Sequence, residues 1–299
     1  MPKTIYRSLK YSAMNSSIEQ LPPLKRGQLL AIAGIIVQAI RPEKIILFGI
    51  AGLTAGPDLS GPEFPSFLSG YDLLVVTRRG ERRYDHELQD LIENRCRNYP
   101  PINLLVHDID HVNSRLSEGH YFFSLMSRDA ILLYDAGLVP LVPASPPDLP
   151  RIRVAAQHDF EKWKLRARAF FNSALFNIQH REWRLALFLL HQTAEQIYQA
   201  ILLAFMGYKP CTHNLDKLRR YTNRFSIELA LVFPRDSEEE DRLFRVLLQA
   251  YVDARYKDDY QITEEESGLL TDRIGRLLSI AERVCRNRFT SLEKMAAGR

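Results

Sequence analysis

Four polar residues lie inside an apolar helical stretch in the second half of the chain. They are His191, Gln192, Glu195 and Gln199, all within residues 185–205. Apolar residues recur there at alternating steps of three and four, which lines one face of a helix. That face consists of Leu187, Leu190, Ala194, Ile197, Ile201 and Ala204. Polar groups on such a helix are costly to bury unless they are paired. They either bond to neighbouring helices of a bundle or face a ligand or a second subunit.

A second set of polar residues lies around residue 255, in the run RYKDDYQ. Arginine and lysine bind phosphate groups, arginine bidentately, and a tyrosine ring can stack on a base. We expect a ligand site formed by Arg255, Tyr256, Lys257, Tyr260 and His213, with His191 as a further candidate.

A purely structural interpretation of the same residues is also open. Arg255 would then pair with a neighbouring carboxylate and fix the turn, and the available partners are Asp253, Asp258 and Asp259. His213, in the run THNLDKL, would cap or pack at the start of a helix, for which Thr212 or Asn214 is the capping residue.

A third set is the run HDIDH, in which His107 and His111 could hold a metal ion. Histidines four residues apart face each other only on a helix, whereas this run straddles the end of a strand. Two ligands of this spacing are a weak metal signal. Asp108 or Asp110 is better explained as the cap of a following helix.

The first half of the chain alternates strands with helices. Strands are expected at 44–48, 71–77, 102–107 and 131–134, and helices at 24–40, 84–96, 111–116 and 122–130. Residues 51–70 are rich in Gly, Pro and Ser and have no periodicity, so we expect a loop there. This order predicts an α/β domain with a small mixed sheet over residues 1–137.

The second half is expected to be all-helical. Residues 138–150 contain five prolines in thirteen positions, which indicates an interdomain linker. Helices are then expected at 157–179, at 185–205 ending at Gly207, after Asn214, from Ser237 and from Thr263, with a short helix or turn at 225–233. Five helices with short connections predict an up-down bundle over residues 151–299.

The bulk composition is that of an ordinary globular protein of about two domains. The 299 residues are 46% hydrophobic and 25% charged, with a net charge of +4. There are 15 basic and 16 acidic residues up to residue 150, and 25 and 20 after it. This excess suits an anionic partner but does not indicate a nucleic-acid surface.

The cysteines and apolar runs predict a cytoplasmic location. Cys96, Cys211 and Cys285 are far apart and lack metal-type spacing, so we expect reduced thiols. The chain does not begin with a pattern resembling a signal peptide. The longest apolar run of the central helix, at 200–206, is too short to span a bilayer.

The order of elements in the first half resembles the nucleotidyltransferase fold of the polymerase-beta type. In that family a Gly-Ser turn after a strand cradles phosphate, and a nearby loop carries an arginine. By this resemblance the glycine is Gly49, but Ile50 stands at the serine position and Leu53 at the arginine position.

The same family holds two magnesium ions with three carboxylates on two strands. The resemblance places these on Gly70, Asp72 and Asn103, so Asp72 is the one remaining acid and the one metal ligand implied. One carboxylate cannot hold two dications together against their repulsion. The resemblance therefore implies a degenerate module, with Mg bound, if at all, together with a nucleotide.

The second half resembles the HEPN domain (higher eukaryotes and prokaryotes nucleotide-binding) over residues 157–287. Its second and third helices are similar to the run LLHQTAEQIYQAILLAFMGYKPCTHNLDKL, and its late segment to YVDARYKDDYQITEEE. The whole chain resembles bacterial proteins in which a minimal nucleotidyltransferase domain precedes a HEPN domain.

Active HEPN ribonucleases have an arginine followed, after four to six residues, by a histidine. Here Arg255 is not followed by a histidine in that interval, where Tyr260 and Gln261 stand. A tyrosine hydroxyl has an ordinary pKa of about 10 and is poorly suited to near-neutral proton transfer. The resemblance thus implies a non-nucleolytic HEPN domain.

These observations favour a binding protein for a nucleotide or another anionic ligand, dimerised through the bundle, rather than an enzyme. The dimer is expected because HEPN relatives dimerise and the helix at 185–205 is apolar on several flanks. Two alternatives remain: an active nucleotidyltransferase that modifies a protein or small molecule, and the fused relic of a HEPN/nucleotidyltransferase toxin–antitoxin pair.

We predict that the purified protein does not transfer nucleotides to an acceptor at an appreciable rate. The reason is the replacement of two carboxylates by Gly70 and Asn103. Incubation with labelled nucleoside triphosphates and Mg²⁺ tests this prediction. A labelled product that disappears in Asp72→Ala would show it to be wrong.

Overall fold

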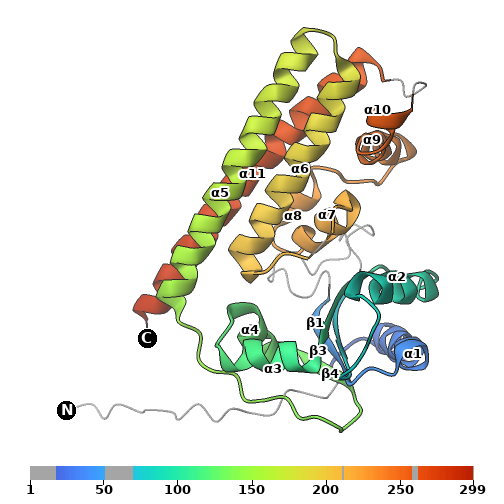
Figure 1. Cartoon of the computed structure of the whole chain (residues 1–299), viewed down its shortest axis with the longest axis vertical. Helices are drawn as coiled ribbons and strands as arrows, with labels where there is room; N and C mark the ends of the chain where they lie inside the picture. The colour runs from blue at the N-terminus through green and yellow to red at the C-terminus, as the bar shows by residue number, and fades with distance from the viewer. Residues whose placement is uncertain (1–17, 51–69, 211, 258–261, 299) are drawn as a thin grey trace. The chain divides into compact units, whose positions relative to one another are not determined.

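The computed structural model describes residues 18–50, 70–210, 212–257 and 262–298 (Figure 1). The chain divides into two compact units. The first comprises Met1–Phe48, Leu73–Tyr99 and Leu104–Pro147, and the second comprises Gly49–Asp72, Pro100–Asn103 and Asp148–Arg299. The end of the first strand and the starts of the next two are thus counted with the helical second unit.

A four-stranded mixed sheet forms in the first half of the chain, as the sequence predicts. Its strands are β1 (Lys44–Ile50), β2 (Tyr71–Thr77), β3 (Ile102–Asp108) and β4 (Ile131–Asp135), in the spatial order β3-β2-β1-β4. β4 runs antiparallel to β1, with Lys44 opposite Asp135. The buried Lys44 ammonium lies 2.6 Å from the Asp135 carboxylate, which offsets the cost of burying its charge.

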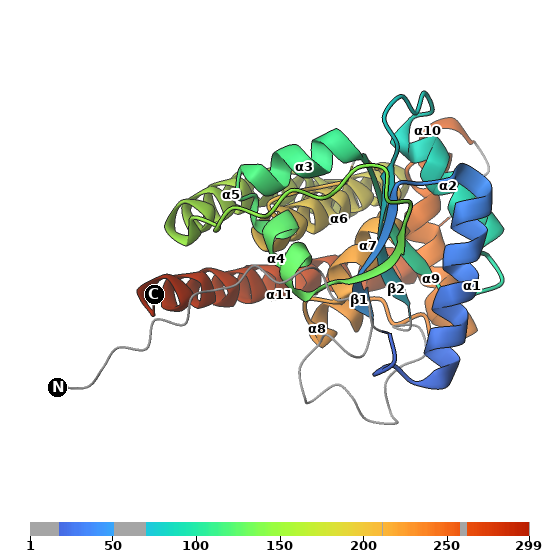
Figure 2. The same cartoon turned by 90° about the horizontal axis from the view of Figure 1, so that it is seen from below.

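Helices cover the sheet because its strands are apolar on both faces. β2 is buried at every residue, and a strand buried on both faces needs a layer on each side. The helices of this half are α1 (Pro23–Ile40), α2 (Asp85–Arg95), α3 (Ile109–Ser117) and α4 (Tyr121–Asp129). In Figures 1 and 2, α1 and α2 lie on one side of the sheet and α3 and α4 on the other. Of the two candidate caps for α3, Asp108 accepts the bond from the His111 backbone N–H.

Three long helices form the frame of the second unit (Figure 1). They are α5 (Leu149–Gln179), α6 (Trp183–Met206) and α11 (Glu264–Ala297), and α6 packs against both of the others. Shorter helices complete the bundle: α7 (Leu215–Asn223), α8 (Ile227–Ala230), α9 (Glu238–Gln249) and α10 (Asp253–Tyr256). The all-helical prediction is confirmed, but the helix expected from Ser237 ends at Gln249 and α10 is a separate turn.

The start of α5 differs from the sequence prediction. The sequence pattern places residues up to Pro150 in the linker and predicts the helix from Gln157. In the structure α5 begins at Leu149. Pro150 occupies the first turn, where a missing N–H costs no helical hydrogen bond. Asp148 caps this turn by accepting a bond from the Arg151 N–H at 3.1 Å.

Four expected helix-end residues of the second half are confirmed. Asn214, Ser237 and Thr263 cap α7, α9 and α11, and Gly207 ends α6 in the left-handed conformation. Within the described ranges, none of the helices combines the length and apolarity required to cross a bilayer.

Candidate functional site

The polar residues of α6 lie on the side of the helix that meets α9, α10 and the segment before α7. The helix is buried along most of its length, including His191, Glu195 and Gln199. Burying three such groups in an apolar core is unfavourable unless each finds a partner. Glu195 and His191 contact residues from two other parts of the second unit, and the Gln199 amide lies near Glu195 on α6 itself.

Glu195 is the centre of this arrangement. Its carboxylate is only 3% exposed, and Oε1 lies 2.9 Å from Nδ1 of His213, whose own side chain is 73% exposed. An ionised carboxylate can only accept hydrogen bonds, so Nδ1 carries the proton and Nε2 is left for another partner. The amides of Gln192 and Gln199 lie at 3.5 Å from the two carboxylate oxygens, which is at the limit for a hydrogen bond.

Tyr251, between α9 and α10, brings the two histidines together. Its ring lies 5.2 Å from that of His191 and 6.4 Å from that of His213, and is nearly parallel to the latter, at 5°. Phe188, one turn before His191 on α6, stacks on the Tyr251 ring as well. His191 and His213 thus both lie near Tyr251, a residue that sequence reasoning missed. In the sequence, Tyr251 is marked only as an aromatic residue shortly before Arg255, and an aromatic residue of the apolar core would look the same.

The short helix α10 is held by Arg184, which sequence reasoning also missed. The Arg184 guanidinium donates to the carbonyl oxygen of Lys257 and, at 3.4 Å, to that of Ala254. This positive group at the end of α10 satisfies carbonyls that a four-residue helix leaves open. α10 therefore stays against the first turns of α6, and α6 carries the polar residues further along.

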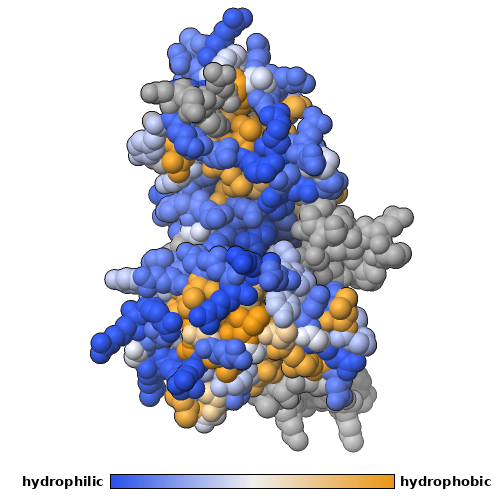
Figure 3. All heavy atoms as spheres, turned by 90° about the vertical axis from the view of Figure 1, so that its right-hand side faces the viewer, coloured by the Kyte–Doolittle hydropathy of each residue, from blue (hydrophilic) through white to orange (hydrophobic). Residues whose placement is uncertain are grey.

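The remaining residues of the predicted ligand site lie on or after α10. Tyr256 is exposed. The Lys257 ammonium pairs with Asp253 at 3.0 Å, and Asp253 is one of the three carboxylates with which the structural interpretation pairs Arg255. The side chain of Arg255 and all of Tyr260 lie outside the described part of the structure. On the face shown in Figure 3, hydrophilic residues predominate around α9 and α10, with apolar residues among them.

Asp72, the implied metal ligand, is engaged by other side chains of the second unit. It is 3% exposed; Asn103 donates to Oδ1 at 2.8 Å, and Arg224 of α7 pairs with Oδ2 at 2.8 Å. Gly49 is required beside it, because a Cβ there would lie 2.2 Å from Oδ2. Ile50 is buried, and Leu53 is outside the described residues.

The HDIDH run forms a packed aromatic cluster in the first unit. His107 is buried, and its ring stacks on that of His111 at 4.6 Å and packs near Phe123. Burial, together with the nearby His111, lowers the pKa of His107 to about 4. Asp110 points elsewhere, since it pairs with Arg79 at 2.7 Å. Among the described residues, no cluster of three or more His, Cys, Asp or Glu side chains is arranged to hold a metal ion.

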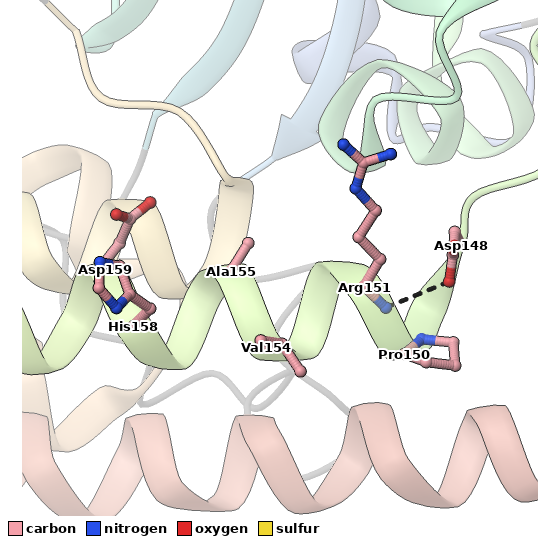
Figure 4. A pocket seen from close by; sticks show the side chains of 7 residues that line it. All are labelled: Asp148, Pro150, Arg151, Val154, Ala155, His158 and Asp159. Carbon is pink, nitrogen blue, oxygen red and sulfur yellow. Dashed lines mark hydrogen bonds between the residues drawn. The ribbon is translucent and has the colours of Figure 1, made fainter.

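A hollow against the first turns of α5 offers less chemistry. Figure 4 shows its described lining, which comes from a single helix and its cap: Asp148, Pro150, Arg151, Val154, Ala155, His158 and Asp159. The one bond drawn is the capping bond from Asp148 to the Arg151 N–H. Side chains from one helix face do not enclose a ligand.

Comparison with known protein families gives a match that lies in the helical second unit. Residues 160–286 match the model of the HEPN domain, which spans most of α5, all of α6 to α10 and the larger part of α11. The chain therefore contains a HEPN domain. No nucleotidyltransferase family matches the first half. No curated protein matches the chain.

The depressed pKa of His107 predicts acid sensitivity of the first unit. The unfolded state binds a proton near pH 6.5 and the folded state only near pH 4, so stability is complete above pH 6.5 and declines between these values. At 1.36 kcal/mol per pKa unit, we expect a loss of about 2 kcal/mol between pH 7 and pH 4.5.

Urea unfolding at the two pH values measures this loss. His107→Leu should reduce the difference, whereas His86→Leu, at an exposed histidine of α2, should leave it unchanged. Equal pH dependence in wild type and His107→Leu would contradict the assignment.

Proposed function

We propose that the chain is a nucleotide- or anion-binding protein and that its HEPN domain binds the ligand along the face of α6 that meets α10. The observation that carries this proposal is that His213 and Tyr251 lie against His191 and Glu195 of α6. α6 is also the helix against which α10 packs. Exposed polar groups that buried neighbours hold in position are the arrangement that a preorganised binding site requires.

The charges of the second half suit an anion. It holds the basic excess of the chain, and α10 ends in the run Arg255-Tyr256-Lys257. Arg184 fixes the backbone of this run through the carbonyls of residues 254 and 257. The backbone of this run is therefore held in a fixed turn, which reduces the entropy lost when the run binds phosphate.

The proposed activity is binding without catalysis. The histidine that active HEPN ribonucleases have after the arginine is absent after Arg255. The Asp72 carboxylate already has the Arg224 guanidinium and the Asn103 amide as partners. Mg²⁺ would accompany the phosphates of the nucleotide, because one carboxylate in such an ion pair is a poor magnesium site. The first half then acts as a degenerate nucleotidyltransferase-like module.

Calorimetry on the full chain tests the binding proposal. A nucleoside triphosphate should bind with or without Mg²⁺, and binding should weaken as salt rises, because exposed charges are screened over about 8–10 Å. Arg255→Ala should lose roughly 1.5–3 kcal/mol of binding free energy, the scale of a charged hydrogen bond. Lys257→Ala should lose less, because its ammonium is exposed and already paired.

Arg245→Ala is the matched control, since Arg245 is an exposed arginine of α9 that pairs with Asp241. Its loss should leave affinity unchanged. If wild type binds none of the common nucleotides, the binding proposal is wrong. If Arg255→Ala lowers the melting temperature without any effect on affinity, the structural interpretation of Arg255 is correct.

We also propose a homodimer formed through the bundle, but through α5 rather than α6. Most of the apolar surface of α6, which the sequence argument uses, is buried within the second unit itself, with Leu185 at its start 49% exposed. Large apolar side chains are instead exposed on α5: Val154, Leu165 and Phe176 are 61%, 65% and 60% exposed. They are eleven residues apart, close to three helical turns, so they share one face.

Sedimentation at micromolar concentration tests the dimer. We expect a species of twice the 34.6 kDa chain mass, and Leu165→Glu should dissociate it by placing two charges in an apolar contact. Leu269→Glu, at an exposed leucine of α11, is the control. A wild-type protein that sediments only as a monomer would rule this dimer out.

A further inference from the structure

Five side chains of the HEPN domain form a closed circuit of neighbours. From Tyr251 the circuit passes to His191 (5.2 Å between ring centres), to Gln192 (3.5 Å), to Glu195 (3.5 Å), to His213 (2.9 Å), and returns to Tyr251 (6.4 Å). Three come from α6, one from the segment before α7 and one from the connection between α9 and α10. We call these five residues the Tyr251 circuit.

The circuit has a buried side and an accessible side. His191 and Glu195 are almost fully buried, whereas Gln192 and Tyr251 are partly exposed and the His213 side chain is largely exposed. The accessible members thus include an aromatic ring, an amide and an imidazole, and the buried members hold two of them in position. This is the composition of a site for a planar ring with a polar edge.

We propose that the Tyr251 circuit receives the base of a nucleotide, which stacks on Tyr251 while its polar edge bonds to Gln192 and His213. The proposal rests on the proposed function and names the part of the ligand that the circuit binds. The phosphates lie toward α10, near Arg184, about two to three helical turns along α6.

The charge of Glu195 determines which end of the ligand the circuit accepts. A phosphate beside a buried carboxylate would be repelled, and the low local dielectric would strengthen the repulsion. A neutral base has no such penalty. The backbone of Arg255 and Lys257 belongs to the turn that Arg184 holds near the start of α6, so a nucleotide with its base at Tyr251 would extend its phosphates toward this turn.

Gln192 and His213 can meet the edge of a base. Both amide contacts of Gln192 are at 3.5 Å, so little energy is lost when the amide turns to a ligand that it can bond with both its donor and its acceptor. His213 is fixed by Glu195 through Nδ1, which leaves Nε2 for the ligand. Hydrogen bonds to base edges and stacking on aromatic rings are the usual means of recognising an unpaired base.

The test compares nucleoside triphosphates with inorganic tripolyphosphate on the full chain by calorimetry. Base stacking contributes about 1–3 kcal/mol, so we expect tripolyphosphate to bind about 5- to 140-fold more weakly. Tyr251→Leu should reduce nucleotide affinity by a similar factor and leave tripolyphosphate unchanged. Gln192→Leu provides a second variant at a partly exposed position if Tyr251→Leu loosens the fold, and Gln157→Leu, on the exposed side of α5, is its control.

Three results would overturn the inference. Equal affinity for nucleotide and tripolyphosphate, unaffected by Tyr251→Leu, would leave the anion site of the proposed function intact but without a base site. A nucleotide preference lost in Tyr256→Leu and retained in Tyr251→Leu would place the base on α10. If neither compound binds, the proposed function and the inference are both wrong.

Discussion

The second unit depends on the burial of one carboxylate, Glu195, in the middle of its central helix. α6 is surrounded by α5, α11 and the shorter helices, so a charge at this position is removed from water on nearly every side. Such a charge is tolerated only with close partners, and the closest, His213, belongs to the segment before α7. The Glu195–His213 bond thereby fixes where the chain re-enters the bundle after Gly207. It also brings His213 alongside Tyr251, and so determines which surface groups lie together.

A comparison of two buried carboxylates explains why one belongs to a candidate site and the other does not. Asp72 and Glu195 are equally buried. Asp72 is neutralised by a guanidinium that is itself largely covered, so its interactions end within the protein. Glu195 is bonded to an imidazole that reaches solvent, so its charge affects a group that a ligand can touch. Asp72 therefore stabilises the fold, and Glu195 can also influence what binds.

Local features of the structure were predictable from the sequence, whereas contacts between distant residues were not. The strand Tyr71–Thr77 was predicted to the residue, because an apolar run between turn residues carries its own boundaries. Asn214 was one of two predicted caps for α7. Pro150 was misassigned because a proline that ends a linker and one that begins a helix look alike in sequence. Tyr251 and Arg184 were missed because their partners lie on other helices, and hydrophobic periodicity does not indicate which helices meet.

The spacing of the exposed apolar residues on α5 has a consequence for the handedness of any helix pair formed there. A seam that returns every seven residues drifts around a straight helix and draws two helices into a left-handed supercoil. Val154, Leu165 and Phe176 return every eleven residues, or about 3.67 per turn, which is slightly more than the 3.6 of a straight helix. Two α5 helices in contact along this seam would therefore run almost straight beside each other, with a slight right-handed coil.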